Sequence, residues 1–461
     1  MKRRELLQMA GTGALAAASA TVPQVAHAIG RQNVLIIGAG LAGLRAGQIL
    51  KAKGHLVTIL EGRNRFGGRC YTSHKWADLP MDLGATWIHE SGKGNPITPI
   101  AKALGLRLAA DSYDKTTAYE AGDGPLTGAD LTYFNTMGDK VRKAMESSGD
   151  SNSEMSLMQY TKNKIGYASM DAYDKRLTDY WMREIGGYEY AGDTAELSAW
   201  YWDNAKEFPG PEVYLPDTGY EPIVNALAQG QDIRLNQIVS KIAYTGTGVT
   251  VTTNVGTYTA DRVIVTVPLG VLKKNKISFS PALPSAYSTA ISKLGMGTGV
   301  LNKVVLRFPS VFWPAKDWLA YVPTSAELGK FHDWFNPSPA LNGKAVLIGF
   351  TAGFYGQQQE ALADWQIVDK AMDVLRDMFG DGIPNPTDYQ VTRWDQDPFS
   401  YGSYSFFATG STPAMVKTLT TAVSNRVFFA GEHTHPDYPQ TTHGAYLSGE
   451  RAANQILALK A

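Results

Sequence analysis

Cysteine is almost absent from this sequence, in which Cys70 is the single thiol among 461 residues. One thiol cannot form an intrachain disulfide, so covalent cross-links do not stabilise the fold. Neither charge is in excess, because 43 lysines and arginines balance 43 aspartates and glutamates. This balance gives no indication of a nucleic-acid partner or of binding to an anionic membrane. No run approaches the ~18 apolar residues of a transmembrane helix, and neither a membrane span nor a metal site is predicted.

The first 28 residues are typical of a targeting segment. Lys2-Arg3-Arg4 gives a basic start, residues 9–22 are weakly apolar, and Ala26-His27-Ala28 is a small-x-small cleavage site. The arginine pair resembles a twin-arginine export signal, although Lys2 replaces the usual Ser or Thr. A frayed N-terminal helix is the alternative. We expect cleavage after about Ala28, a twin-arginine export machinery as partner, and a periplasmic or secreted location.

A dinucleotide fingerprint follows this segment. Asn33–Ile37 is a short apolar run, Gly38-Ala39-Gly40-Leu41-Ala42-Gly43 opens a helix-like segment, and a second apolar run stops at Glu61. Strand, glycine turn, helix, strand and acid in this order predict a bound dinucleotide. Glu61 lies 18 residues after Gly43, where its carboxylate can accept from a ribose hydroxyl. The same carboxylate would repel a 2′-phosphate, which argues against NADP.

The glycines of the fingerprint have separate predicted roles. Gly38 permits the tight turn, Gly40 lets the backbone approach a pyrophosphate, and Gly43 lets the helix pack closely on the strand. The helix that begins with Leu41 and Ala42 supplies free N–H groups and a positive dipole end to the phosphates.

A second glycine pair occurs in Arg65-Phe66-Gly67-Gly68-Arg69 and also suggests backbone close to a ligand. Arg69 is suited to contact a phosphate with both arms of its guanidinium. A glycine turn with a solvated arginine is the alternative.

The length of 461 residues predicts two domains, and the strand, helix and strand of the fingerprint predict an α/β fold. Residues 111–202 show a mostly helical pattern that ends in dense aromatics, which are more often core than a ligand cavity. Strands are expected at 233–239, 249–253, 257–259, 262–267, 300–308, 344–350 and 426–430, and helices at 365–378 and 444–458. The C-terminal segment repeats the pattern of a strand, a glycine-containing turn and a helix that is typical of dinucleotide-binding domains. We therefore predict a discontinuous cofactor domain over 29–110, 215–300 and 392–461, and a substrate domain over 111–214 and 301–391.

Taken in order, these pieces resemble the flavin-containing amine oxidase family, closest to polyamine oxidases and to the catalytic domain of lysine-specific histone demethylases. The resemblance covers nearly the whole chain after residue 30. The pieces that carry it are 38–43 with Glu61, 65–69, 84–89, 260–273, 302–304, 431–434 and 443–449.

The resemblance implies the two-domain FAD-linked amine oxidase fold, with a Rossmann-like FAD-binding domain and a mixed-sheet and helical substrate domain. It places Glu61 at the ribose, Gly68 and Arg69 near the pyrophosphate, and the backbone of Val239 at the adenine. Positions along the ribityl chain and flavin match Gly84, Ala85, Thr86, Trp87, Gly431 and Glu432. Thr442 begins the C-terminal helix, whose positive dipole end would stabilise the reduced flavin anion.

The resemblance also implies which residues surround the flavin ring and the substrate amine. Lys303 matches the lysine that holds a water at flavin N5, and its apolar strand neighbours favour a lowered pKa on burial. Trp394 matches a tryptophan beside the flavin, and Tyr404 matches the first residue of an aromatic cage. The second cage position is Thr441, where many relatives carry tyrosine, which suggests room for a bulkier or secondary amine. His89 and Glu189 match substrate-facing positions.

Monoamine oxidases tether their flavin through a cysteine, but that position is Ser403 here, so non-covalent FAD is expected. The family reaction takes a hydride from the carbon beside a neutral amine nitrogen to flavin N5. The imine is then hydrolysed, and O2 reoxidises the flavin and yields H2O2. The partners are therefore a small-molecule amine and O2, for a monomer or a dimer. An L-amino-acid oxidase and a non-catalytic flavin-binding protein on the same scaffold are the alternatives.

Overall fold

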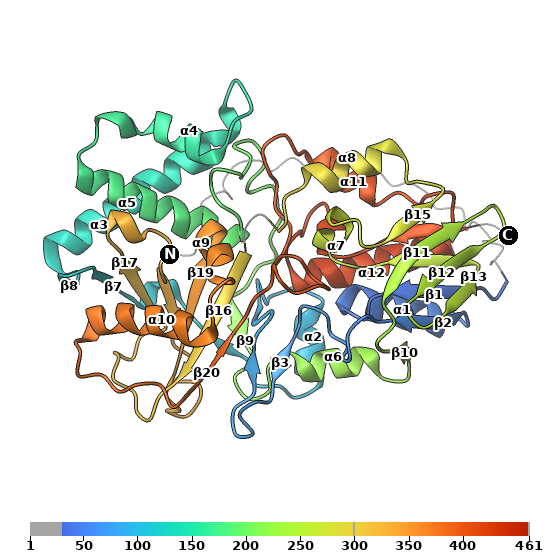
Figure 1. Cartoon of the computed structure of the whole chain (residues 1–461), viewed down its shortest axis with the longest axis horizontal. Coiled ribbons are helices and arrows are strands. Elements are labelled where there is room, and N and C mark those ends of the chain that lie inside the picture. The colour runs from blue at the N-terminus through green and yellow to red at the C-terminus, as the bar shows by residue number, and fades with distance from the viewer. Residues whose placement is uncertain (1–29, 298–299, 460–461) are drawn as a thin grey trace, which may run out of the picture.

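The computed structural model describes residues 30–297 and 300–459. Two lobes lie side by side along the long axis of the molecule (Figure 1). One contains a parallel sheet with a smaller sheet beside it, and the other contains a larger mixed sheet beneath a group of helices. The targeting segment predicted at residues 1–28 lies outside the described residues. The domain boundaries predicted from the sequence stay a prediction.

The parallel sheet combines strands from both ends and the middle of the chain. In spatial order its strands are β10 (Asp232–Arg234), β2 (Leu56–Leu60), β1 (Asn33–Ile37), β14 (Arg262–Val265) and β21 (Val427–Phe429). Each neighbouring pair runs parallel. Successive side chains of a strand point to opposite faces, so a strand covered on both sides is apolar throughout. The unbroken apolar run of β1 follows from this position.

The two faces of this sheet have different cover. Val34 and Ile36 pack in the core with helices α1 (Leu41–Ala52) and α12 (Thr442–Leu457). A Cβ at Gly449 would lie 2.1 Å from the Ala42 carbonyl oxygen, so glycine permits the close approach of these two helices. The alternate residues of β1 pack toward a four-stranded sheet. Its strands are β13 (Thr257–Ala260), β12 (Val249–Thr253), β11 (Val239–Tyr244) and β15 (Ser278–Ser280).

One predicted strand is wrong. The sequence predicts a single strand at 233–239, but the chain leaves β10 after Arg234 and enters β11, in a different sheet, at Val239. Between them Asn236 has φ +58°, a left-handed conformation that asparagine tolerates and that turns the chain. The other predicted strands of both lobes are present, with ends shifted by one or two residues.

The mixed sheet has seven strands, and only β17 and β7 run parallel. In spatial order they are β20 (Asp388–Val391), β16 (Val300–Arg307), β19 (Val346–Ala352), β18 (Asp333–Phe335), β17 (Trp318–Val322), β7 (Thr116–Glu120) and β8 (Gly124–Pro125). Helix α10 (Asp364–Phe379) covers one face through Ile367, Ala371 and Leu375. The segment 111–202 therefore contributes two strands to this sheet as well as helices.

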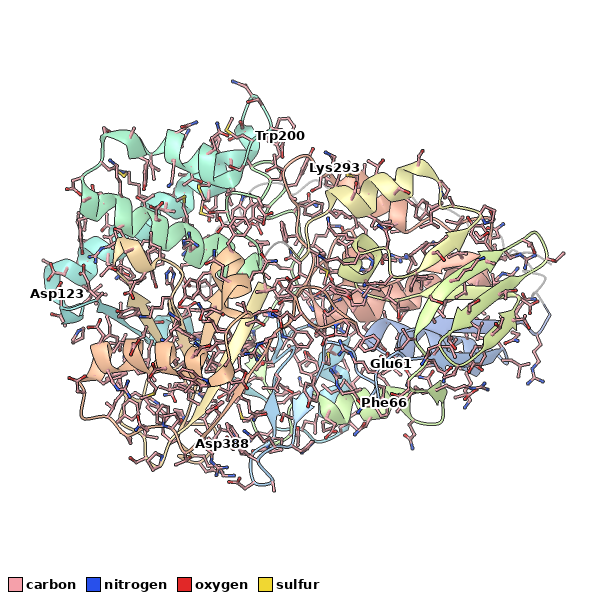
Figure 2. All side chains as sticks on the ribbon, viewed as in Figure 1. Glu61, Phe66, Asp123, Trp200, Lys293 and Asp388 are labelled. Carbon is pink, nitrogen blue, oxygen red and sulfur yellow. The ribbon has the colours of Figure 1, made fainter. Side chains whose placement is uncertain are left out.

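Helices α3 (Gly128–Glu146), α4 (Leu157–Lys164) and α5 (Ala172–Met182) form the group above the mixed sheet (Figure 1). Helix α5 continues into a π-helical stretch, Arg183–Tyr188. Most of the aromatics at the end of this segment belong to the core, as the sequence predicts, and Trp202 is buried. Trp200 is an exception at 37% exposure, and Figure 2 shows it at the upper surface.

The remaining elements connect the lobes or cover their edges. They are β3 (Thr72–Ser73), β4 (Met81–Asp82), β5 (Trp87–Ile88), α2 (Ile97–Ala103), β6 (Ala109–Ala110), β9 (Val213–Tyr214), α6 (Glu221–Ala228), α7 (Leu269–Lys273), α8 (Ser285–Lys293), α9 (Gly353–Gln359), α11 (Pro413–Leu419) and a short 3-10 helix, Glu432–Thr434. Within 30–297 and 300–459, no helix is long and apolar enough to cross a bilayer.

Candidate active site

The glycine turn between β1 and α1 has the shape of a phosphate cradle. Gly38 has φ +104°, and a Cβ at Gly43 would lie 2.0 Å from the Gly38 carbonyl oxygen. A Cβ at Gly40 would meet no atom within 4 Å, so open space adjoins the turn at the position predicted for the pyrophosphate. In this part of the described chain, α1 has neither a side-chain cap nor an acid in its first turn. Its first N–H groups, from Leu41 onward, are thus available to an anion.

Glu61 follows β2 directly and is 6% exposed. Its carboxylate accepts from the Ala39 N–H at 2.7 Å and from the Arg63 N–H at 2.8 Å. These bonds hold the acid beside the glycine turn, and Figure 2 shows it on the side of the parallel sheet that faces the other lobe. Gln237, two residues before Val239, donates its N–H to the Glu61 carbonyl at 2.8 Å. The residues predicted for the adenosine end therefore lie together.

An ion pair joins an N-terminal and a C-terminal segment of the chain at Arg69, which is predicted to lie near the pyrophosphate. Arg69 donates to Glu432 at 3.0 Å and to the Ser403 carbonyl at 2.8 Å. Glu432 also accepts from the Ser405 hydroxyl at 2.6 Å and from the Gln440 N–H at 3.0 Å. Burial alone would raise the pKa of Glu432, but the charge of Arg69, with His433 and the Ser405 hydroxyl, outweighs it and lowers the pKa.

The residues beside this ion pair approach the glycine turn closely. Gly68 has φ +59°, and a Cβ there would lie 3.3 Å from the Gly40 Cα atom. Gly431 has φ +125°, and a Cβ there would meet the ring of His433 at 2.8 Å. At both positions the positive φ and the neighbouring protein atoms require glycine, and the cofactor contacts predicted for Gly68 and Gly431 stay a prediction.

Lys303 lies in β16 and is 5% exposed. Its ammonium donates to the carbonyls of Asp82 at 3.0 Å and Gly84 at 2.6 Å, and to the Thr86 hydroxyl. The same nitrogen lies 5.7 Å from the Trp87 ring centroid. Burial lowers the pKa of Lys303 and raises that of Asp82. The predicted lowered pKa of the lysine is thus present.

The segment 84–87 connects this lysine to the Arg69 region. The Ala85 N–H donates to the Arg69 carbonyl at 3.1 Å, and a Cβ at Gly84 would lie 1.8 Å from the same oxygen. One short stretch therefore contacts the predicted pyrophosphate residues on one side and Lys303 on the other.

Trp394 and Tyr404 flank β16. The Trp394 N–H donates to the Asn302 side chain at 3.1 Å, and Trp394 is 8% exposed. Ser403, beside Tyr404, exchanges hydrogen bonds with the Leu301 N–H at 2.9 Å and carbonyl at 3.0 Å. The predicted catalytic residues Lys303, Trp394 and Tyr404 therefore come from neighbouring pieces of backbone.

The Tyr404 hydroxyl is held at the end of the π-helical stretch. It donates to the carbonyls of Glu189 at 3.0 Å and Tyr188 at 3.2 Å. Burial, with the charges of Glu189 and Glu432, raises the pKa of Tyr404 well above its usual range. The phenol is thus neutral and in one orientation, and the Glu189 side chain is exposed nearby.

Thr441 has a structural role that the sequence did not reveal. Its hydroxyl accepts from the Gly444 N–H at 2.9 Å and donates to the Tyr438 carbonyl at 3.0 Å, so Thr441 is the N-cap of α12. The next residue, Thr442, lies 3.0 Å from the Tyr220 hydroxyl. The N-terminus of α12 is therefore anchored at both of its first residues.

His89 forms an ion pair that the sequence did not predict. Its Nδ1 lies 2.5 Å from a carboxylate oxygen of Glu212. Burial alone would lower the pKa of His89, but Glu212, with Glu189 and Glu90 nearby, raises it to about 9. Glu212 precedes β9, which pairs with β5 beside His89. Only this non-local pairing brings the two together, so no local sequence signal could have found Glu212.

Asp111 is a second carboxylate that motif reasoning missed. It accepts from the indole N–H groups of Trp87 at 3.0 Å and Trp318 at 2.8 Å. The two indoles are stacked with centroids 5.8 Å apart. Burial raises the pKa of Asp111 to about 6, against the effect of both indole donors. This acid fixes the orientation of Trp87 at the predicted flavin position.

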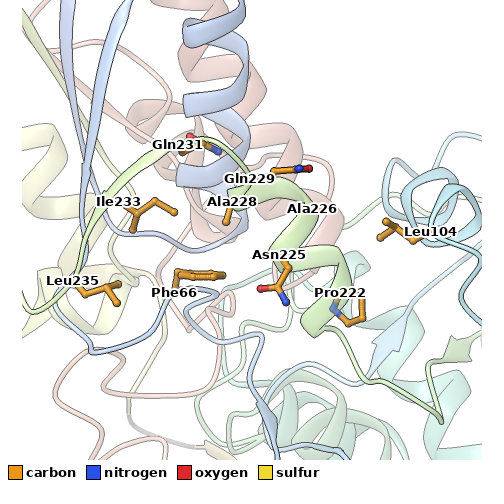
Figure 3. A pocket seen from close by; sticks show the side chains of 10 residues that line it. All are labelled: Phe66, Leu104, Pro222, Asn225, Ala226, Ala228, Gln229, Gln231, Ile233 and Leu235. Atoms are coloured by element: carbon orange, nitrogen blue, oxygen red, sulfur yellow. The ribbon is translucent and has the colours of Figure 1, made fainter.

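A hollow of about 670 Å³ opens elsewhere on the surface, between α6, β10 and Phe66 (Figure 3). Apolar residues such as Phe66, Ile233 and Leu235 contribute much of its lining. Apart from its position beside 65–69, it contains none of the predicted cofactor or substrate residues.

Residues 41–457 match the protein family described as flavin containing amine oxidoreductase. The chain belongs to this family. Polyamine oxidase 4 of Oryza sativa subsp. japonica is 36% identical over 439 residues, which cover 92% of this chain and 88% of the relative. Lysine-specific histone demethylase 1 homolog 2 of Arabidopsis thaliana is 36% identical over 446 residues, which cover 92% of this chain and 58% of that relative.

Among solved structures, wild-type putrescine oxidase bound to putrescine aligns with a TM-score of 0.76 and 19% identity, over 93% of this chain and 99% of that one. This similarity confirms the FAD-linked amine oxidase fold predicted from the sequence. The protein is a flavin-dependent amine oxidase, and its cofactor is FAD. Neither an L-amino-acid oxidase nor a non-catalytic flavin-binding protein is favoured by these relatives.

The residues of this flavin-containing amine oxidoreductase fit the cofactor. Open space at Gly40 adjoins an uncapped helix N-terminus, as a pyrophosphate requires. Glu61 is buried and accepts from the Ala39 N–H of that turn, and the buried Glu432 is paired with Arg69. The residue assignments at the reacting end stay a prediction.

Proposed function

We propose that this amine oxidase acts on polyamines or related amines. Bound FAD supplies the acceptor for the hydride that leaves the carbon beside the amine nitrogen. The observation that carries the proposal is the convergence of buried Lys303 with Trp394 and Tyr404 around one strand. Two plant polyamine oxidases with 36% and 33% identity over nearly the whole chain support the substrate class.

In this proposal Tyr404 and Trp394 provide the apolar surroundings in which an ammonium loses its proton. Desolvation disfavours the charged amine, and only the neutral amine has the lone pair that hydride removal requires. The Tyr404 hydroxyl is already bound to two carbonyls, so the phenol presents its ring rather than an acid. Lys303 keeps its own proton through three acceptors, and it would hold a water for the flavin by exchanging one of these three bonds.

The outer part of the site suits a second positive centre. Glu189 is exposed and its backbone carbonyl accepts from the Tyr404 hydroxyl, so we assign its carboxylate to the distal ammonium of a polyamine. The neighbouring Glu212 carboxylate is paired with His89 and is partly neutralised by it. At Thr441 a small side chain replaces a second cage aromatic, which leaves room for a substituted nitrogen.

Anaerobic mixing tests the proposal. The purified holoenzyme is mixed with spermidine, spermine, a monoamine and L-amino acids in turn, and flavin bleaching is followed. We expect bleaching by a polyamine. Bleaching by amino acids alone would contradict the substrate class, and bleaching by the monoamine alone would restrict it to simple amines.

We also propose that FAD is bound without a covalent bond, because Ser403 occupies the tethering position and the single cysteine, Cys70, is a different residue and is buried. Acid precipitation should release all of the FAD into the supernatant. Flavin that stays with the pellet would show a covalent link.

We propose export by a twin-arginine pathway, supported by Arg3-Arg4 and the small-x-small site at 26–28. Full-length protein in a bacterial host should reach the periplasm with FAD bound, and Arg3→Lys with Arg4→Lys should retain it in the cytoplasm. Equal periplasmic yields for both proteins would exclude this route. Sedimentation of the mature chain would separate a monomer from a dimer.

A further inference from the structure

A buried carboxylate that no motif includes lies behind the predicted catalytic residues. Glu360 follows α9 directly and is 4% exposed. Its carboxylate accepts three hydrogen bonds: from the Asn302 amide at 2.7 Å, the Asp395 N–H at 3.0 Å and the Gln396 N–H at 2.8 Å. Its carbonyl accepts from the Arg393 guanidinium at 3.1 Å. A carboxylate that accepts several donors in a buried place makes strong, directional bonds.

Asn302 connects Glu360 to the predicted catalytic residues through further hydrogen bonds. Its side-chain oxygen accepts from the Trp394 N–H at 3.1 Å and from the Thr392 hydroxyl at 3.0 Å. The Thr392 hydroxyl accepts in turn from the Lys303 N–H at 2.8 Å, and the Thr392 N–H donates to the Lys303 carbonyl at 3.0 Å. One continuous chain of hydrogen bonds thus runs from Glu360 to the backbones of Lys303 and Trp394.

The network controls backbone positions at two points. Lys303 is held at its ammonium by carbonyls of the 82–84 segment, and at its backbone by Thr392. Trp394 lies within the loop 393–396, of which Glu360 binds three members directly. A displacement of this loop would move the indole, whereas a displacement at Asn302 would move the strand position of Lys303.

We propose that Glu360 is a positioning residue for amine oxidation. It fixes Lys303 and Trp394 relative to each other through Asn302 and Thr392, and it does not itself touch the substrate. This inference rests on the roles given to Lys303 and Trp394 in the proposed function. Burial raises the pKa of Glu360 and its three donors oppose this, which is consistent with a carboxylate maintained for its bonds.

The substitution Glu360→Gln tests the carboxylate with little change of shape. An amide offers one acceptor oxygen, and its NH2 group faces a donor, so at least one of the three bonds is lost. We expect the rate of anaerobic flavin reduction at saturating polyamine to fall at least tenfold, with KM changed less than twofold. FAD content should equal that of the wild type.

Two further variants complete the experiment. Thr392→Val keeps the shape and removes the hydroxyl link, so it should lower the same rate in the same direction even if Glu360→Gln folds poorly. Asp364→Asn is the matched control, because it removes an exposed carboxylate, 48% accessible, that pairs with Arg393 of the same loop. Its reduction rate should equal that of the wild type.

Visible circular dichroism of the bound FAD gives a readout that needs no substrate. Side chains packed against the ring shape this spectrum, so Glu360→Gln should change it in the same sense as Trp394→Phe. A lower melting temperature with unchanged rate and dichroism would show a purely structural role and overturn the inference. If no polyamine reduces even the wild type, the proposed function fails, while the dichroism still decides the positioning role.

Discussion

A buried histidine should make this protein sensitive to mild acid. His332 is 0% exposed, and its ring lies 4.9 Å from that of Tyr180 and 5.5 Å from that of Tyr188. Its Nε2 accepts from the Gly329 N–H at 2.8 Å, whereas its Nδ1 is buried and has no hydrogen-bond partner among the described residues. Burial, with a smaller effect of Arg183, lowers the pKa of His332 to about 3.

The sign and size of the effect follow from linkage. In the unfolded chain a histidine has a pKa near 6.5, so between pH 7 and pH 5 the unfolded state gains a proton that the folded state does not bind. The stability of the folded state is therefore unaffected by His332 above the pKa of the unfolded histidine, and it falls as the pH drops below that pKa. Between pH 7 and pH 5, His332 should cost about 2 kcal/mol of unfolding free energy. His433 is 2% exposed with a pKa of about 4 and should add a similar loss.

Urea denaturation of the holoenzyme at pH 7 and pH 5, followed by tryptophan emission, measures this loss. In His332→Gln the loss between the two pH values should shrink by about 2 kcal/mol, because glutamine can still accept from Gly329 and does not titrate. An equal loss in wild type and His332→Gln would refute the reasoning.

Other predictions concern the cofactor and the chemistry. Lys303→Met should lower turnover at least tenfold, since positioned proton carriers contribute about 10²-fold or more, while the ratio of FAD to protein absorbance stays constant; turnover at the wild-type rate would exclude the proposed role. Arg69→Met leaves the buried Glu432 without its cation, which costs about 3–5 kcal/mol and should lower both the melting temperature and the FAD content. Gly40→Ala should fold normally, because its methyl group meets no protein atom within 4 Å. It should bind FAD more weakly, because the methyl group enters the space predicted for the pyrophosphate, and titration of the apoprotein with FAD would detect this. Gly43→Ala should give little folded protein, because its Cβ would lie 2.0 Å from a carbonyl oxygen; normal yield and circular dichroism would contradict this.

The local parts of the fold were predictable because their signals are local. The glycines of the turn, the apolar run of β1 and the acid at Glu61 lie within one short stretch, and each has a steric or electrostatic reason. The helix predicted at 365–378 has the same local basis, since its apolar residues repeat at helical spacing, and α10 is present at Asp364–Phe379.

The rest depends on contacts between distant residues. The strand predicted at 233–239 is wrong because the left-handed Asn236 ends one strand and directs the chain to another sheet. Glu212 meets His89 only through the pairing of β5 and β9, and nothing in its own neighbourhood marks it. Glu360 has the same character, because its three donors come from two other segments of the chain.

The ion pair between Arg69 and Glu432 has a consequence for biosynthesis. The two residues are 363 positions apart, and β21 of the parallel sheet is equally late in the chain. At about 5–20 residues per second, a ribosome needs roughly 20–70 s to proceed from one to the other. During that interval the nascent glycine turn lacks the partners that complete its binding site. The binding site is therefore completed only after Glu432 has been synthesised, and a chain that ends before Glu432 would lack a complete cofactor site.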